Sequence, residues 1–423
     1  MKRKALLVLV AIACLAAVAF GQSGKEVQLR FLSLQVGVHP EAKWFEQTVA
    51  SFNTQYKGKI RIVVDGVAGD QAAWEKLRTD AAADTMPDLL MVKADRSEFN
   101  VLAQSGRVVD LKPFIAKDAA LKAKLNDAGA LATYTDDNGR LLGIPYAKAY
   151  VGIYYNKDLF RKAGLSGFPT TWDGFLAASE KLKKSGVAPI SLMTGENAWT
   201  SMLMLANFIG TSNAGMKWLA TKPEAQDFSA AVFVDAVAKL QTLLEDYTTP
   251  DAVGAGYGVA ANNFLQGQTA MIANGPWMIG SFSDPKSAPA GFEPKVGYAL
   301  APGNGVIAME NIAYGSGSKP SDKQAASFEF LKYLTRDDVY SAYLSTGGAA
   351  PGFKTDMSKV NYPRINKEFV PIAVAAKYKY TIFPNAVKPA VVDAMNQLLP
   401  ELAAGRLSPA EFAGKCADIS ASN

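Results

Sequence analysis

A tryptophan follows an apolar run in the stretch QGQTAMIANGPWMIGSF, residues 266–282. The run ends at Asn274 and Gly275, and a proline and Trp277 come next. A large flat ring loses little conformational entropy when it is ordered, so it can serve as a platform for the apolar face of a ligand. A core tryptophan beside a turn would give the same pattern. The rest of the sequence has to decide between these two interpretations.

Other side chains that carry hydrogen-bonding groups or rings stand where apolar runs end or where elements meet. They are Gln35, Lys93, Asp95, Arg96, Lys148, Tyr150, Glu196, Asn197, Trp199, Asn274, Glu310, Asn311, Phe383 and Asn385, with backbone donors at Gly275 and Gly348. Amides, carboxylates and cations can all bond the hydroxyl groups of a small molecule. Each position also has a structural alternative, such as a helix cap at Asp95, hinge packing at Lys148 or plain turn chemistry at Gly348.

The residue types give little support to catalysis or to metal binding. His39 is the only histidine of the chain, and no cysteine cluster accompanies it, whereas a zinc site needs several such ligands. A glycosidase needs a positioned pair of carboxylates, for which Asp95, Glu196 and Glu310 would be the candidates. The sequence contains no recognisable nucleophile beside a base. We therefore expect neither an enzyme nor a cofactor nor a metal site.

The N-terminus has the layout of a secretory signal peptide. Residues 1–4 are basic, residues 5–20 are almost wholly apolar, and small residues precede Gln22. This pattern predicts cleavage after residue 21 and a location in the periplasm or at the cell surface. Attachment of a lipid at Cys14 is the alternative, although Ala11 stands where a lipoprotein signal usually has leucine.

The mature chain would be close to neutral. Removing residues 1–21 takes away three of the 44 basic residues and leaves 41 against 39 acidic ones. Nucleic acids and acidic membrane surfaces attract strongly basic proteins, so we expect neither as a partner. Cys416 would be the one remaining cysteine, and a buried core rather than a disulfide must then stabilise the chain.

Strand and helix patterns alternate along the chain. Strands are expected at 27–34, 59–64, 88–92, 151–155, 188–193, 269–273 and 295–302, and helices at 40–56, 71–83, 96–104, 157–163, 172–184, 321–334 and from 389 onward. Asn138 and Gly139 predict a hairpin turn. This alternation is typical of α/β sheets with right-handed crossovers. Ligands of such sheets bind outside the carboxyl ends of the strands.

Five stretches carry a family resemblance, in the same order as in the family. They are GIPYAKAYVGIYYNKDLFRKAGL (143–165), FPTTWDGFLAASEKLKKSG (168–186), FLQGQTAMIANGPWMIG (264–280), GSGSKPSDKQAASFEFLKYLT (315–335) and IFPNAVKPAVVDAMNQLLPELAAGRLSPAEFAGK (382–415). Together they resemble the extracellular solute-binding proteins of carbohydrate-uptake ABC importers, the maltose-binding-protein-like family. Each stretch is weakly diagnostic alone, whereas the ordered set spans most of the mature chain.

The resemblance implies the two-lobe α/β fold of periplasmic binding proteins, often called a Venus flytrap. Both lobes would be discontinuous in sequence. The first would contain 25–146 and 300–335, and the second 150–298 and 338–423. The crossings between them would fall near 146–150, 298–302 and 335–338, with the ligand held in the cleft.

The resemblance also implies a function and several contacts. A monomer would bind a mono- or oligosaccharide and deliver it to the membrane permease subunits of an ABC importer. Asp95 and Arg96 match a pair that contacts sugar hydroxyls in maltodextrin-binding relatives, and Glu196 and Trp199 stand where the family places acidic and aromatic contacts. Trp277 would then be a platform for the sugar. Two alternatives stay open: the same fold binding another solute such as glycerol phosphate, and a secreted carbohydrate-active enzyme.

Overall fold

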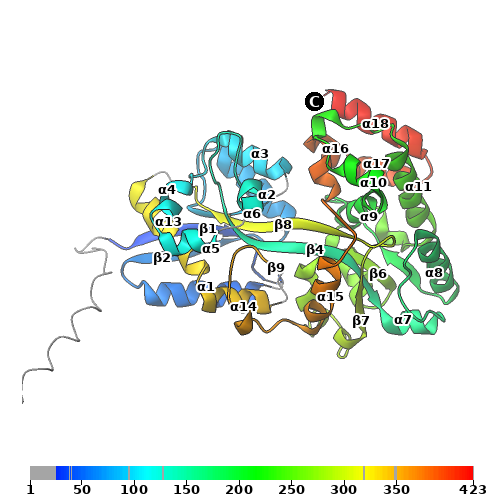
Figure 1. The fold of residues 1–423 in the computed structure, drawn as a ribbon, viewed down its shortest axis with the longest axis horizontal. Helices are drawn as coiled ribbons and strands as arrows, with labels where there is room; N and C mark the ends of the chain where they lie inside the picture. Colours follow the sequence, from blue (N-terminus) through cyan, green and yellow to red (C-terminus); the bar gives the residue numbers. More distant parts are fainter. Residues whose placement is uncertain are drawn as a thin grey trace, which may run out of the picture.

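The computed structural model describes residues 25–37, 39, 41–93, 96–125, 128–317, 320–346 and 350–422. The predicted signal peptide lies outside these residues. The chain forms two α/β lobes side by side, joined by the strands β4 (Ile144–Asn156) and β8 (Gly305–Gly315), as Figure 1 shows. Within the described part, no helix is both long enough and apolar enough to cross a membrane.

The first lobe is built on three parallel strands. β1 (Val27–Ser33) lies between β2 (Ile60–Gly66) and β3 (Leu89–Lys93). Helix α1 (Ala42–Gln55) covers them and buries Trp44, Phe45, Thr48, Val49 and Phe52, which recur at helical spacing. These elements confirm the strand and helix pattern predicted from the sequence.

The remaining elements of this lobe are α2 (Asp70–Ala82), α3 (Arg96–Ser105), α4 (Lys112–Ala116), α5 (Ala119–Lys124), α6 (Ala128–Thr133), α13 (Ser321–Leu334), α14 (Asp337–Ser345) and β9 (Ala350–Pro351).

The predicted turn at Asn138 and Gly139 is confirmed, because Gly139 has φ +76° and the flanking Thr135 and Leu141 are bridged. We call the buried cluster of this lobe, which includes Phe31, Phe52, Val92 and Tyr314, the first-lobe core.

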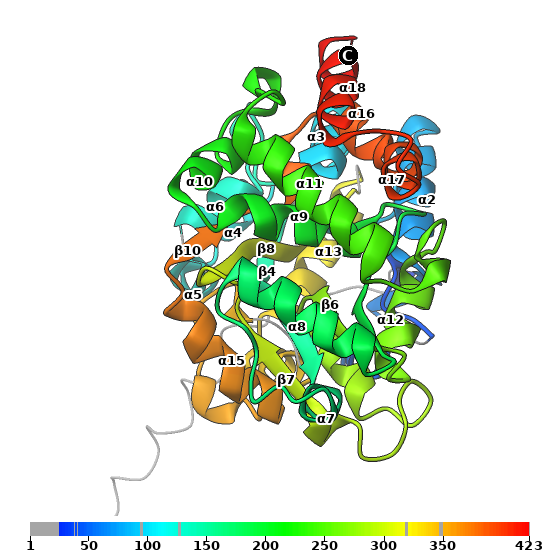
Figure 2. The same ribbon diagram turned by 90° about the vertical axis from the view of Figure 1, so that its right-hand side faces the viewer.

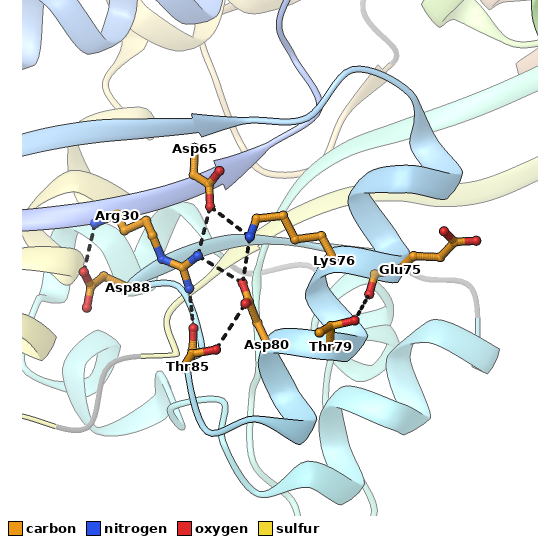
Figure 3. A network of polar contacts seen from close by, with 8 residues as sticks. All are labelled: Arg30, Asp65, Glu75, Lys76, Thr79, Asp80, Thr85 and Asp88. Atoms are coloured by element: carbon orange, nitrogen blue, oxygen red, sulfur yellow. Dashed lines mark hydrogen bonds and ion pairs between the residues drawn. The ribbon is translucent and has the colours of Figure 1, made fainter.

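A charged network fastens the first lobe together (Figure 3). The guanidinium Nη1 of Arg30 on β1 lies 2.9 Å from Asp65 Oδ2 on β2 and 3.0 Å from Asp80 Oδ2 on α2. Lys76 Nζ approaches the same two oxygen atoms at 3.5 and 3.7 Å. The backbone N–H of Arg30 donates to Asp88 Oδ2 at 2.8 Å. Two strands, one helix and the segment before β3 are thus held at one point.

The second lobe contains β5 (Ala188–Ser191) parallel to β6 (Thr269–Asn274), with β7 (Val296–Ala299) and β10 (Tyr378–Tyr380). Its α-helices are α7 (Lys157–Lys162), α8 (Trp172–Lys184), α9 (Trp199–Gly210), α10 (Asn213–Leu219), α11 (Ala231–Asp246), α12 (Tyr257–Leu265), α15 (Arg364–Val374), α16 (Pro389–Asp393), α17 (Met395–Ala403) and α18 (Pro409–Ser422). Viewed end-on in Figure 2, α9 and α11 lie on one side of the strands and α15 on the other. The predicted caps are confirmed, since Asn156 and Thr171 accept hydrogen bonds from the first turns of α7 and α8.

Two large buried clusters and a small one, formed by Met193, Ala255 and Ala260, fill the second lobe. The second-lobe core includes Ile153, Phe233 and Met271 and lies among α9, α11 and the strands. A smaller cluster, called the Tyr154 core here, includes Tyr154, Ile272, Phe282, Tyr298 and Phe369. β6 is buried along its whole length, as expected for a short apolar strand with both faces covered.

The connection between the lobes is an antiparallel pair of long strands. Residues 144–151 of β4 pair with 307–314 of β8, and residues 152–155 of β4 then pair with β6. β8 pairs with β3 at its end in the first lobe and with β10 at its end in the second. β8 was not predicted, because the polar residues in the middle of GVIAMENIAYG interrupt the apolar run.

One expected lobe boundary is wrong. We placed residues 338–423 in the second lobe, yet Val339, Tyr340 and Tyr343 of α14 are buried in the first-lobe core. The indole Nε1 of Trp44 donates to the backbone oxygen of Val339 at 3.2 Å. The chain joins the Tyr154 core only with α15, through Ile365 and Phe369. Helix α13 ends at Leu334 and α14 begins at Asp337. Because the connection is this short, α14 packs beside α13 in the first lobe.

Candidate functional site

A cleft of about 950 Å³ lies between the two lobes at the β4–β8 pair. Residues of α3 and α6 line it from the first lobe, and Leu219 of α10 lines it from the second; Figure 1 shows these helices in the two lobes. Its polar lining residues are Asn100, Gln104, Thr133, Thr135, Asp136, Asp137, Asn138, Lys148, Tyr150, Thr221, Lys222, Glu224, Glu310, Thr381 and Asn385. Both lobes supply lining side chains, so a ligand in this cleft would contact both at once.

Four of the predicted binding residues line this cleft: Lys148, Tyr150, Glu310 and Asn385. Lys148 and Glu310 are paired in register across β4 and β8, with Lys148 Nζ 3.5 Å from Glu310 Oε1. A shift in the register just before Lys148 marks a bulge in the strand pair, a feature that redirects side chains. Asn385 donates from Nδ2 to Thr381 Oγ1 at 2.9 Å. The antiparallel register therefore places an ion pair at the crossing between the lobes.

The cleft also includes residues that the sequence did not point to. Asp136 and Asp137 come from the turn that was predicted only as a hairpin, and Thr221 and Glu224 come from the segment after α10. The carboxylate of Asp136 accepts hydrogen bonds from the backbone and side chain of Arg140. Burial raises the pKa of Asp136, but these hydrogen bonds outweigh it and hold the pKa below its ordinary value. Turn position was the available signal, because loops carry binding residues disproportionately often.

A pair of tryptophans forms a second group of candidate residues. The ring centroids of Trp199 and Trp277 are 5.9 Å apart, with the ring planes at 50°. Trp277 is partly buried and packs against the first-lobe core, the second-lobe core and the Tyr154 core. Asn274, the last residue of β6, is fully buried, and its Nδ2 donates to the hydroxyl of Tyr257 at 3.0 Å. Trp277 thus lies where the lobes meet, and it is not enclosed in one core.

The loop before Trp199 has an unusual backbone. Glu196 and Ala198 both have φ +49°, in the left-handed region that non-glycine residues seldom adopt. The exposed Glu196 accepts a hydrogen bond at Oε2 from the backbone N–H of Tyr257, at 3.1 Å. Asn197 lies between them and is partly buried. Strain of this kind persists where surrounding contacts hold it in place, and it is frequent at functional sites.

Nine of the predicted residues that the structure describes do not line the cleft: the six of the tryptophan group, Glu196, Asn197, Trp199, Asn274, Gly275 and Trp277, and also Gln35, Lys93 and Phe383. Gln35 is 1% exposed, and its amide is bonded to Glu41 and to the hydroxyl of Tyr314. Phe383 is fully buried and stacks with Trp218 and Phe233, so it cannot offer a ring to a ligand. Lys93 forms an ion pair with Asp70 beside the partly buried Trp74. A strand-end position alone did not reveal that neighbouring side chains cover Gln35 and Phe383.

Four further predictions cannot be placed. Asp95 and Gly348 lie outside the described residues, as do the side chains of Arg96 and Asn311. Within the part of the chain that the structure does describe, no group of three or more His, Cys, Asp or Glu side chains could hold a metal ion.

Comparisons with known proteins agree with this architecture. Residues 37–340 match the family of bacterial extracellular solute-binding proteins. The multiple sugar-binding protein of Streptococcus mutans is 25% identical over 299 residues, which cover 68% of this chain and 67% of that protein. The sn-glycerol-3-phosphate-binding periplasmic protein of Rhizobium meliloti is 27% identical, but the match covers only 46% of this chain and 45% of that protein.

Solved structures show the same fold. A chitin oligosaccharide binding protein superposes with a TM-score of 0.83 at 24% identity, covering 94% of this chain and 99% of the other. A Streptococcus pneumoniae solute-binding protein in complex with the blood group A-trisaccharide gives 0.74 at 22% identity, covering 94% and 100%. The family match spans well over half of the sequence and agrees with the two lobes and their connecting strands. The chain belongs to the bacterial extracellular solute-binding proteins.

Proposed function

We propose that this protein binds a carbohydrate in the interlobe cleft and delivers it to the permease subunits of an ABC importer. The observation that carries the proposal is the cleft itself, which both lobes line with hydrogen-bonding side chains. The tryptophan pair packs at the lobe junction, outside the residues that line this cleft, and would supply an aromatic surface to a ligand that reaches it. The names of the relatives, which include a multiple sugar-binding protein, support the same ligand class.

The chemistry of the lining suits a polyhydroxylated ligand. Carboxylates and amide oxygens accept hydrogen bonds from hydroxyl groups, and lysine and amide N–H groups donate to them. Lys148 and Glu310 supply a donor and an acceptor at the floor, and Asn138 and Asn385 can do both from opposite lobes. An aromatic ring completes such a site because the C–H face of a sugar packs on it. A volume of about 950 Å³ is large for a single small solute.

Closure of the lobes would complete the site. The ligand would bridge them, and hinge closure around a bound ligand is a common transition in periplasmic binding proteins. β4 and β8 span both lobes, so a change of backbone angles near their bulge would move one lobe against the other. Recognition of the closed form by a permease is then the step that couples binding to transport.

The charge of the cleft favours a neutral sugar over a phosphorylated solute. The lining includes the carboxylates of Asp136, Asp137, Glu224 and Glu310 and the lysines Lys148 and Lys222. A phosphate group is usually recognised by clustered arginine or lysine side chains. Among the described lining residues, two lysines stand beside four carboxylates, and one of the lysines is paired with Glu310, which makes a poor phosphate site. We therefore place glycerol phosphate second to a neutral carbohydrate.

Isothermal titration calorimetry against neutral mono- and oligosaccharides, with glycerol 3-phosphate as a comparison, tests the function. We expect heat from at least one neutral sugar, and Trp277→Ala should weaken that binding at least tenfold. Trp172→Ala is the matched control, because Trp172 lies on α8 and donates to Thr211 away from the cleft. Binding of glycerol 3-phosphate with no response to any sugar would overturn the carbohydrate proposal.

Three further points belong to the same proposal. The protein acts after export, with cleavage after residue 21 leaving Gln22 as the first residue, and without lipid at Cys14. It works as a monomer and does not hydrolyse its ligand. Intact mass of the exported protein distinguishes cleavage from lipidation, light scattering gives the oligomeric state, and chromatography of incubated oligosaccharide detects any released product.

A further inference from the structure

Strand β4 carries one extra residue just before it reaches the cleft. Pro145 pairs with Ala313 of β8 and Ala147 pairs with Ile312, so Tyr146 between them has no counterpart on β8. A bulge of this kind takes the extra residue out of the hydrogen-bonded ladder. Tyr146 is buried, so its backbone oxygen needs a hydrogen-bond donor from another part of the protein.

A tyrosine hydroxyl from α14 supplies that donor. Tyr340 donates from its hydroxyl to the backbone oxygen of Tyr146, and the backbone N–H of Gly352 donates to the same hydroxyl at 2.9 Å. The Tyr340 ring is fully buried, with the Phe353 ring centroid at 4.0 Å and the Tyr146 centroid at 4.8 Å. One hydroxyl thus joins the bulge in β4 to the chain that follows β9.

The segment that contains β9 lies directly against the bulge. β9 pairs antiparallel with β4 and places Ala350 opposite Lys148. A Cβ atom added to Gly352 would lie 2.7 Å from the carbonyl carbon of Tyr146 and 2.9 Å from the nitrogen of Ala147, so the two backbones are in contact. Lys148 therefore stands in the middle of three strands, with β9 on one side and β8 on the other.

The bulge controls what β4 presents to the cleft. Lys148 and Tyr150 follow it and line the cleft with their polar groups. They stand two residues apart, on the same face of the strand, because strand side chains alternate between faces. A slip of one residue would turn both side chains away from the ligand. The hydrogen bond at Tyr146, two residues before Lys148, is placed to prevent such a slip.

We propose that Tyr340 is a positioning residue, which fixes the bulge at Tyr146 and so holds Lys148 in place for the ligand. This inference rests on the proposed carbohydrate-binding function. Tyr340 is not among the described residues that line the cleft, and it acts through β4. A donor that is held in place before the ligand arrives loses less entropy on binding, which is how a preorganised site gains affinity.

Tyr340→Phe tests the inference because it removes only the hydroxyl that bridges Tyr146 and Gly352. A longer hydrogen bond from the Gly352 N–H to the Tyr146 oxygen, at 3.4 Å, would remain. Tyr343→Phe is the matched control: Tyr343 lies three residues later on α14, is equally buried, and its hydroxyl has no hydrogen-bond partner among the described residues. Calorimetry measures sugar affinity, and mass spectrometry follows hydrogen exchange of peptides covering 144–151 in the ligand-free protein.

We expect Tyr340→Phe to speed amide exchange in residues 144–151 and to weaken sugar binding about three- to tenfold, as for the loss of one hydrogen bond. Tyr343→Phe should change neither quantity. Unchanged exchange in this segment of the Tyr340 variant would overturn the inference, and so would faster exchange with unchanged affinity.

A double-mutant cycle separates positioning of Lys148 from a general effect on the site. If Tyr340 acts through Lys148, Tyr340→Phe should change the affinity by less than about twofold in a Lys148→Met background. The same loss in both backgrounds would overturn the inference. Lys148→Arg replaces Lys148→Met in the cycle if the methionine variant binds too weakly to measure. If the wild-type protein binds no carbohydrate, the proposed function fails, and hydrogen exchange alone then decides whether Tyr340 fixes the bulge.

Discussion

The indole of Trp277 lies directly on the backbone of Gly275, two residues earlier in the chain. Gly275 has φ −102°, an angle open to any residue, so a side chain is excluded by contact and not by backbone strain. We expect Gly275→Ala to displace the ring, to weaken carbohydrate binding at least tenfold and to destabilise the fold by about 1–3 kcal/mol, as overpacking does. Calorimetry and urea unfolding measure the two effects.

Gly258→Ala is the control for that substitution. Gly258 lies in α12, and an added Cβ there would meet no atom within 4 Å. Alanine favours a helix interior over glycine by up to about 1 kcal/mol, so this variant should be at least as stable as the wild type and bind normally. Equal binding by both alanine variants would contradict the platform arrangement.

Phe383 should behave as a core residue, in contrast to Trp277. It is fully buried, and its ring stacks with Trp218 and Phe233 at interplanar angles of 9° and 11°. Phe383→Ala should therefore lower the free energy of unfolding by about 3–5 kcal/mol. The affinity of the protein that remains folded should be unchanged. Phe383→Leu, which keeps most of the side-chain volume, should lower the free energy of unfolding far less. A loss of affinity without a loss of stability in either variant would show that Phe383 contacts the ligand.

Arg30 should contribute strongly to the stability of the first lobe. Its guanidinium reaches both Asp65 and Asp80 (Figure 3), and the Asp80 side chain is only 10% exposed. Arg30→Met would leave the two carboxylates with Lys76, and Asp80 also with the hydroxyl of Thr85, which donates to its Oδ1 at 3.1 Å. Loss of one partner from a buried pair costs about 3–5 kcal/mol; because Arg30 is one-third exposed and Lys76 remains, we expect about 2–3 kcal/mol in urea unfolding.

An exposed arginine provides the comparison for Arg30. Arg161 pairs with Asp158 at 3.0 Å, but its side chain is 74% exposed. Solvent screens such a pair, so Arg161→Met should change the unfolding free energy much less than Arg30→Met. Similar losses in the two variants would show that the network in Figure 3 adds nothing beyond a surface ion pair.

Asp118 should make stability depend on pH in the acid range. The hydrogen bond from Lys332 and that from the Leu121 N–H lower the pKa of Asp118. Its folded pKa thus lies below the unfolded value of about 3.9. The stabilisation is complete above that pH and is lost as the pH falls through the folded pKa. Asp118→Asn keeps an oxygen for the helix cap, so its deficit in unfolding free energy should be larger at pH 7 than at pH 2.5. Lys332→Met should show the same trend, and a deficit independent of pH would contradict it.

Local patterns were sufficient for most of the secondary structure. The buried face of α1, with Trp44, Thr48 and Phe52 at helical spacing, follows from periodicity alone. The caps at Asn156 and Thr171 follow from side chains that bond the next few N–H groups. These interactions join residues within four positions of each other, which a single sequence displays. The segment 305–315 was missed because its strand exists through pairing with β3, β4 and β10, all distant in the chain.

The sequence by itself determined the strands, helices and turns, the resemblance to solute-binding proteins, and the residue types at the ends of strands. Only the tertiary structure decided which of those residues meet. It buried Gln35 and Phe383, paired Lys148 with Glu310, and packed Trp199 against Trp277. The physical reason is that alternation and helical period fix the face on which a side chain stands, whereas its neighbours on that face come from segments tens to hundreds of residues away.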